Sequence, residues 1–136
     1  MAESLRLSPA QLEAIIGHAR ACRPEEACGV LAGDRDGRVL RVFLMENAEH
    51  SEVFYQMDSQ EQFQVFDEME RESLDLVSIF HSHPHSPAFP SEHDRGLAFY
   101  PDAVYLIVSL MDDEPDCRAF RIEEGSIREI DILTED

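Results

Sequence analysis

Lysine is absent from this sequence of 136 residues, and all eleven basic residues are arginines. Twenty-nine aspartates and glutamates outnumber them, which gives a formal net charge of −18. A surface this acidic repels phosphate backbones and anionic lipid headgroups, so we expect no binding to nucleic acid or membranes. The composition fits equally a protein from a salt-accumulating cytoplasm and an acidic mesophilic protein that is depleted of lysine by chance.

Long apolar segments and paired cysteines are also missing. No run approaches the roughly 20 residues that span a membrane, and MAESLRLSPA lacks the charged, then apolar pattern of a signal peptide. The three cysteines have no C-x-x-C spacing, which argues against a disulfide framework or an all-thiolate zinc site. We therefore expect a cytoplasmic protein, and the length fits one domain over residues 1–136.

Two amphipathic helices are expected. In LSPAQLEAIIGHARAC, Ser8 is the expected N-cap, Gln11 completes a capping box, and apolar residues follow at helical spacing. DSQEQFQVFDEMERES predicts the second helix, with Phe63, Phe66 and Met69 directed inward.

Strand candidates surround these helices. ACGVLAGDRDGRVLRVFLMEN predicts two strands around a turn at Asp36-Gly37, and the first is apolar on both faces, as in a central strand. VFYQM (53–57) is a short strand candidate, and LDLVSIF (74–80) is a buried one. The last three are AVYLIVSL (103–110), CRAFRIE (117–123) and SIREIDIL (126–133), the final pair joined at Glu124-Gly125. The pattern predicts an α+β fold, a mixed sheet covered by helices.

Four of the six histidines lie within HSHPHSPAFPSEHD. Residues two apart in a strand point to the same side, so His81 and His83 can bind one ion together. Ser91 is the expected N-cap of a short helix through SEHDRGLAFY, which places Asp94 in the first turn, able to face the imidazoles. Two imidazoles, one carboxylate and an open fourth position make a hydrolytic zinc site, which acidifies bound water to a pKa of about 7.

Each part of this motif also has a purely structural interpretation. H-x-H is often a pair of satisfied polar residues, and S-x-x-D is most often a capping box. His85 follows a proline that ends strand pairing, and His93 does not share a helix face with Asp94, so both are expected to face solvent. Cys28 is expected to be a small hydrophobic residue of a central strand and not a nucleophile.

A zinc-bound hydroxide also needs a base that takes its proton and later passes it to the leaving amine. RPEEACGVLAG places Glu25 and Glu26 at the mouth of the first central strand. Their spacing does not show which of the two would be the base, and it also fits a plain pair of surface carboxylates.

The complete motif resembles the JAMM metallopeptidases, the catalytic branch of the MPN domain family. It comprises H-S-H-P at residues 81–84, six further residues, S-E-H-D at residues 91–94, and the upstream Pro24-Glu25-Glu26. The order of helices and strands is similar to the family's over nearly the whole chain. PEEACGVLAG and FYQMDSQEQ further resemble the small bacterial members that hydrolyse conjugates of ubiquitin-like sulfur-carrier proteins.

The resemblance implies an MPN fold of the cytidine-deaminase-like type, with a mixed curved sheet flanked by helices. It implies one Zn²⁺ per chain, bound by His81, His83 and Asp94 with water as the fourth ligand. Glu26, at the family's Pro-x-Glu position, would be the general acid/base, and Ser91 would polarise the scissile carbonyl or stabilise its oxyanion. The implied substrate is a ubiquitin-like sulfur-carrier protein, cut at a peptide or isopeptide bond after its C-terminal tail.

The alternative function is a non-catalytic MPN scaffold, against which the intact ligand set and Glu26 argue. The chain lacks the large insertions by which eukaryotic deubiquitinating members grip a second ubiquitin, so an amino acid or short peptide is the favoured leaving group. EVFYQM is a candidate sheet edge that could add an extended Gly-Gly tail as one more strand. An ordinary paired strand with core aromatics is an equally good interpretation of that segment.

Overall fold

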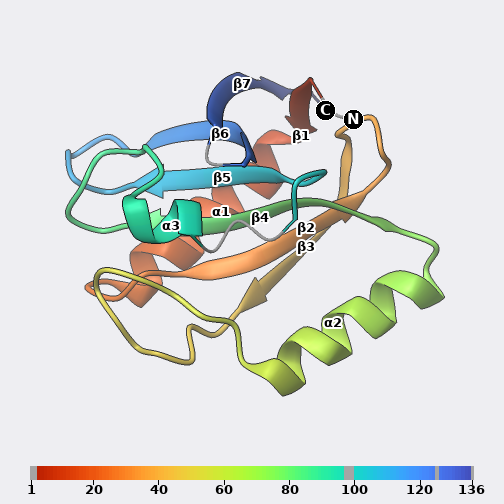
Figure 1. The fold of residues 1–136 in the computed structure, drawn as a ribbon, viewed down its shortest axis with the longest axis horizontal. Coiled ribbons are helices and arrows are strands. Elements are labelled where there is room, and N and C mark those ends of the chain that lie inside the picture. Colours follow the sequence, from red (N-terminus) through yellow and green to blue (C-terminus); the bar gives the residue numbers. More distant parts are fainter. Residues whose placement is uncertain (1–2, 97–99, 125, 136) are drawn as a thin grey trace.

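The computed structural model describes residues 3–96, 100–124 and 126–135. In this part of the chain, seven strands form one sheet in the order β1-β7-β6-β5-β4-β2-β3, accompanied by three helices (Figure 1). The helices are α1 (Pro9–Cys22), α2 (Ser59–Arg71) and α3 (Glu92–Gly96). The strands are β1 (Ser4–Leu7), β2 (Cys28–Gly33), β3 (Val39–Met45), β4 (Asp75–His83), β5 (Val104–Ser109), β6 (Asp116–Glu123) and β7 (Ser126–Thr134). No described helix is long and apolar enough to cross a bilayer.

The sheet is mixed and curved, as expected. β4 pairs with β2 in antiparallel and with β5 in parallel orientation. The two outermost strands, β1 and β3, approach each other where Arg6 forms an isolated bridge with Arg38, and the Arg6 amide donates to the Gly37 carbonyl at 2.8 Å. The sheet must bend strongly for its two outermost strands to meet in this way.

Helix α1 begins where the capping signal predicts. The Ser8 hydroxyl accepts the Gln11 amide at 3.1 Å, and the Gln11 side-chain oxygen accepts the Ser8 amide at 2.8 Å. Ile15 and Ala19 are buried against a core on one face of the sheet that includes Phe80 of β4. The alternation of side chains along β4 therefore places Phe80 toward α1 and His81 on the opposite face.

Helix α2 packs on a second core, formed with residues of β2 and β3. Val65 and Met69 are buried there, and Phe66 is partly buried. The inward placement of Phe63 was wrong, because its side chain is 72% exposed. The buried stripe runs through Val65, Phe66 and Met69, and Phe63 falls outside it.

Several element boundaries differ from the sequence-based expectation. The strand at VFYQM was wrong, because in residues 51–57 only Met57 pairs, as an isolated bridge to Asn47. Strand β1 was not predicted, and β4 continues through His83, beyond the expected end at Phe80. Residues 97–99 of the expected short helix and Gly125 of the expected turn lie outside the described residues.

Strand β2 is buried along its whole length, as expected for a central strand, and its packing leaves no space at Gly29. A Cβ atom at this position would overlap the carbonyl oxygen of Phe43 and the ring of Phe80.

We expect Gly29→Ala to lower the free energy of unfolding by about 1–3 kcal/mol, because the core must shift to admit the methyl group. Gly17→Ala is the matched control: nothing lies within 4 Å of the added methyl group on α1. It should raise stability by up to about 1 kcal/mol through helix propensity. Urea unfolding measures the free energy of unfolding of both variants. An unchanged free energy of unfolding in Gly29→Ala would contradict the described packing.

Candidate metal centre

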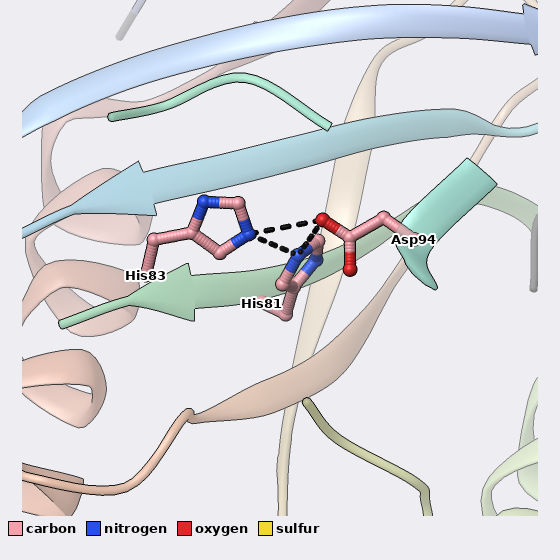
Figure 2. A group of neighbouring side chains, drawn as sticks. All are labelled: His81, His83 and Asp94. Atoms are coloured by element: carbon pink, nitrogen blue, oxygen red, sulfur yellow. Dashed lines mark hydrogen bonds and ion pairs between the residues drawn. The ribbon is translucent and has the colours of Figure 1, made fainter. Parts of the chain in front are cut away.

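His81, His83 and Asp94 form one buried group at the end of β4 (Figure 2). The two histidines lie at the C-terminal end of β4, and Asp94 reaches them from α3. Asp94 Oδ2 lies 3.1 Å from His81 Nε2 and 3.0 Å from His83 Nε2. The two Nε2 atoms are themselves 3.0 Å apart. The structure thus brings together the three residues expected as ligands.

Asp94 is oriented by the predicted capping box. The Ser91 hydroxyl accepts the Asp94 amide at 3.0 Å, and the Ser91 amide donates to Asp94 Oδ2 at 2.9 Å. These reciprocal bonds fix both the start of α3 and the direction of the carboxylate. The capping role of Ser91 is therefore confirmed, and its catalytic role stays a prediction.

The donor atoms fit a bound cation. His83 Nδ1 lies 2.8 Å from the Pro87 carbonyl, which can only accept, so Nδ1 carries the hydrogen. In neutral His83, the Nε2 lone pair then faces the Asp94 carboxylate, an arrangement that repels unless a cation lies between them. Ligand atoms at about 2.0–2.1 Å from a tetrahedral zinc ion would lie roughly 3.3 Å apart, which is close to the observed spacing.

The electrostatics of the group also favour a positive charge. Burial raises the pKa of Asp94, but hydrogen bonds from His81 and His83 outweigh it and hold the pKa well below its ordinary value. Burial lowers the pKa of His83, but its hydrogen bond to Asp94 reverses the shift, so that the pKa is raised. Burial dominates for His81 and lowers its pKa. A proton on His83 would therefore compete with a metal ion for the same place beside Asp94.

The two neighbouring glutamates lie in different environments. Glu25 is at the surface, where it pairs with His50 Nδ1 at 3.1 Å. Glu26 is only 3% exposed, and its Oε1 has no hydrogen-bond partner among the described residues. Burial raises the pKa of Glu26 to about 8, His83 lowers it, and the Asp94 carboxylate raises it. Glu26 is thus the carboxyl group that is electrostatically linked to the metal-ligating candidates.

Two supporting residues were not found from the sequence. Ser82 lies between the histidines and faces the other side of β4, where its hydroxyl accepts the Ala27 amide at 2.7 Å. The Ser82 amide donates to the Ala27 carbonyl at 3.0 Å, so the chain beside Glu26 is bonded to the strand that carries the ligands. The ring of Tyr55 stacks on His81, with centroids 4.6 Å apart and planes at 25°. Alternation along the strand signals Ser82; no local pattern signals Tyr55.

The other candidate side chains lie outside the group, as expected. His85 is exposed and pairs with Glu52 at 3.0 Å, and the ring of His93 contacts Phe54 at 5.1 Å. Cys28 is fully buried in β2, and burial raises the pKa of its thiol to about 12. Burial and the raised pKa therefore disfavour a thiolate at Cys28 near neutral pH.

Comparison with known proteins identifies the family. The model of the prokaryotic homologues of the JAB domain matches residues 8–123. The chain belongs to this family. The CysO-cysteine peptidase of Mycobacterium tuberculosis is 43% identical over 120 residues, which are 87% of this chain and 82% of that protein. The desampylase of Haloferax volcanii is 34% identical over 139 residues, covering 96% of each chain. A probable TtuB-protein conjugate cleaving protease of Thermus thermophilus is 32% identical over 115 residues, 84% of this chain and 73% of that protein.

Solved structures agree with this assignment. A Desulfitobacterium hafniense protein solved in solution superposes with a TM-score of 0.88 and 38% identity, covering 97% of this chain and 93% of that one. A JAB1/MPN domain protein of Archaeoglobus fulgidus gives a TM-score of 0.61 at 18% identity, covering 95% and 99%, which shows the fold alone. This JAB-family chain therefore has the expected MPN fold, and its relatives named as peptidases and desampylases make it a hydrolase of the isopeptidase type.

The raised pKa of Glu26 predicts a pH-dependent cost to folding. Its folded-state pKa of about 8 exceeds the ordinary value of 4.5, so the stability that it contributes is present at acidic pH and lost as the pH rises through about 8. Glu26→Gln removes that charge. After chelator treatment, it should raise the melting temperature more at about pH 9 than at about pH 5. Glu25→Gln is the exposed control, and an equal pH response in both variants would contradict the burial argument.

Proposed function

We propose that this JAB-family protein is a zinc-dependent hydrolase that cuts the peptide or isopeptide bond after the C-terminal tail of a ubiquitin-like sulfur-carrier protein. The observation that carries the proposal is the buried group in which two imidazoles and the Asp94 carboxylate converge. The relatives support the substrate class, because one is named a CysO-cysteine peptidase, another a desampylase and a third a probable TtuB-protein conjugate cleaving protease.

His81, His83 and Asp94 would hold the zinc ion. The chemistry that zinc supplies when bound is the acidification of a water molecule to a pKa of about 7. The hydrogen bond from His83 Nδ1 to Pro87 orients one ligand ring, and the Ser91 amide orients the carboxylate. The chain thus contributes three donors, of which the His83 ring and the Asp94 carboxylate are oriented by hydrogen bonds to the main chain.

Glu26 would act as the general acid/base. Its carboxyl group is buried beside the ligand group, with a pKa near 8 that a nearby cation would lower toward neutrality. A pKa near the working pH lets one group accept the water proton and later deliver it to the leaving amine. This double task explains why a carboxyl group is kept at a position where its charge is costly.

Ser91 would assist at the scissile carbonyl. Its oxygen accepts the Asp94 amide, which leaves the hydroxyl hydrogen available to donate elsewhere. A donor beside the ligand group could stabilise the oxyanion that develops during attack. Because VFYQM forms no strand, addition of the substrate tail to a strand at that segment is not part of the proposal.

Ligand substitutions test the metal site. His81→Ala and Asp94→Ala should each lose the single zinc ion per chain, because three protein donors are the minimum of such a site. His85→Ala should retain it, since His85 is exposed and pairs with Glu52. Metal content by mass spectrometry after dialysis distinguishes these results. Loss of zinc from His85→Ala would show that the ligand set is wrong.

The activity is tested with a sulfur-carrier protein that ends in Gly-Gly followed by one amino acid. Glu26→Gln should keep zinc and fold but lose about 10²–10⁴-fold in rate, because the proton shuttle is removed. Glu25→Gln should remain active. Carrier tails ending in Ala-Ala before the same amino acid, and polyubiquitin, should be cut poorly. Equal cutting of both tails, or preference for polyubiquitin, would contradict the proposed substrate.

A further inference from the structure

Asn47 is a buried amide two residues after the end of β3, and the proposed chemistry does not use it. It is 5% exposed, and its side chain bonds only to main-chain groups. Its Nδ2 donates to the carbonyls of Glu26 at 3.0 Å and Phe54 at 3.1 Å. Its Oδ1 accepts the amides of Glu49 at 3.1 Å and Gln56 at 3.2 Å. One side chain therefore ties residues 49–56 to the main chain of Glu26.

Glu26 depends on such contacts because it lies between elements. It follows α1 and precedes β2, so neither a helix nor a strand ladder fixes its backbone. The Glu26 amide donates to the Ser51 carbonyl at 2.8 Å, and the Glu26 carbonyl accepts from Asn47. The next residue, Ala27, is held by Ser82. Consecutive backbone groups are thus bonded to the 47–56 segment and to the ligand strand.

The segment that Asn47 ties down also lies against the candidate metal group. Tyr55 stacks on the His81 ring, and the ring of Phe54 contacts His93 on α3. Asn47 bonds to the residues on both sides of Tyr55, through the Phe54 carbonyl and the Gln56 amide. The same amide that holds Glu26 therefore also holds the ring that covers one ligand.

Only an amide satisfies this environment. Its nitrogen donates to two carbonyls while its oxygen accepts two amides, whereas a carboxylate would accept but could not donate. An alanine would leave buried carbonyl and amide groups unpaired.

We propose that Asn47 is a positioning residue that holds the Glu26 carboxyl beside the His81–His83–Asp94 group. It does so by bonding the Glu26 carbonyl and clamping residues 49–56. The inference rests on the proposed function, because it acts through Glu26 as the general acid/base. Asn47 touches no reacting atom, so its loss should lower kcat and leave the metal in place.

Asn47→Asp is the sharpest test, because it keeps the acceptor for Glu49 and Gln56 and loses the donor to Glu26. We expect kcat to fall about 10- to 100-fold, as for a misplacement near 1 Å, with KM and zinc content nearly unchanged. In the Glu26→Gln background, the same substitution should lower kcat little further, because the carboxyl group that Asn47 positions is already gone. Asn47→Ala should behave alike.

Asp34→Ala is the control for a merely structural loss. Asp34 Oδ1 also accepts two backbone amides, from Asp36 at 3.0 Å and Arg38 at 3.4 Å, in the turn between β2 and β3. This variant should lower the melting temperature without changing kcat. An unchanged kcat in a folded Asn47 variant would overturn the inference. So would a double variant with Glu26→Gln whose loss of kcat equals the product of the two single losses.

Two further results separate the possible failures. If Glu26→Gln itself is fully active, the proposed function fails whatever Asn47 does. If neither Asn47 variant folds, hydrogen exchange of the unaltered protein decides. The amides of Glu26 and Gln56 should be protected as strongly as those within β2, and rapid exchange at either would contradict the clamp.

Discussion

The Asp94 carboxylate placed between two imidazoles is the interaction on which the remaining structure of the site depends. One oxygen lies within 3.1 Å of both Nε2 atoms, inside a region with little access to water. A buried carboxylate is costly unless positive charge neutralises it, and the Pro87 bond turns the His83 lone pair toward it. The arrangement therefore favours a positive charge beside Asp94, and its three donor atoms are close enough together to bind one metal ion.

The surroundings serve this group in two different ways. Capping by Ser91 and the bond to Pro87 fix the donors directly. Ser82 and Asn47 instead fix the main chain next to Glu26, one from the ligand strand and one from the loop. The buried Glu26 charge opposes folding, a cost in stability that the proposed proton transfer by Glu26 would explain.

Local patterns predicted much of the site. The period of two along a strand gave the shared direction of His81 and His83, and S-x-x-D gave the cap that orients Asp94. Choosing Glu26 over Glu25 required the family resemblance, because adjacent residues have no distinguishing spacing. The structure adds that one of them is buried and the other pairs with His50 at the surface.

Contacts distant in the sequence were out of reach. Asn47 bonds to Glu26 across 21 positions, and no local pattern predicts this contact. Ser82 bonds to Ala27 across 55 positions; strand alternation predicts the side of β4 that Ser82 faces but not this partner. VFYQM has strand-like composition, yet an amide side chain and not a ladder partner satisfies its neighbouring main chain. Phe63 was misplaced because helical spacing allows neighbouring stripes, and tertiary packing selected the one through Val65 and Met69.

One cation is expected to bind among His81, His83 and Asp94. Anomalous diffraction from a crystal of the zinc-loaded protein, recorded on both sides of the zinc absorption edge, tests it most directly. A single peak bonded to His81 Nε2, His83 Nε2 and an Asp94 oxygen, at about 2.0–2.2 Å from each, is the predicted result. A peak elsewhere in the chain, or one that includes His85 or Glu26 as a ligand, would contradict it.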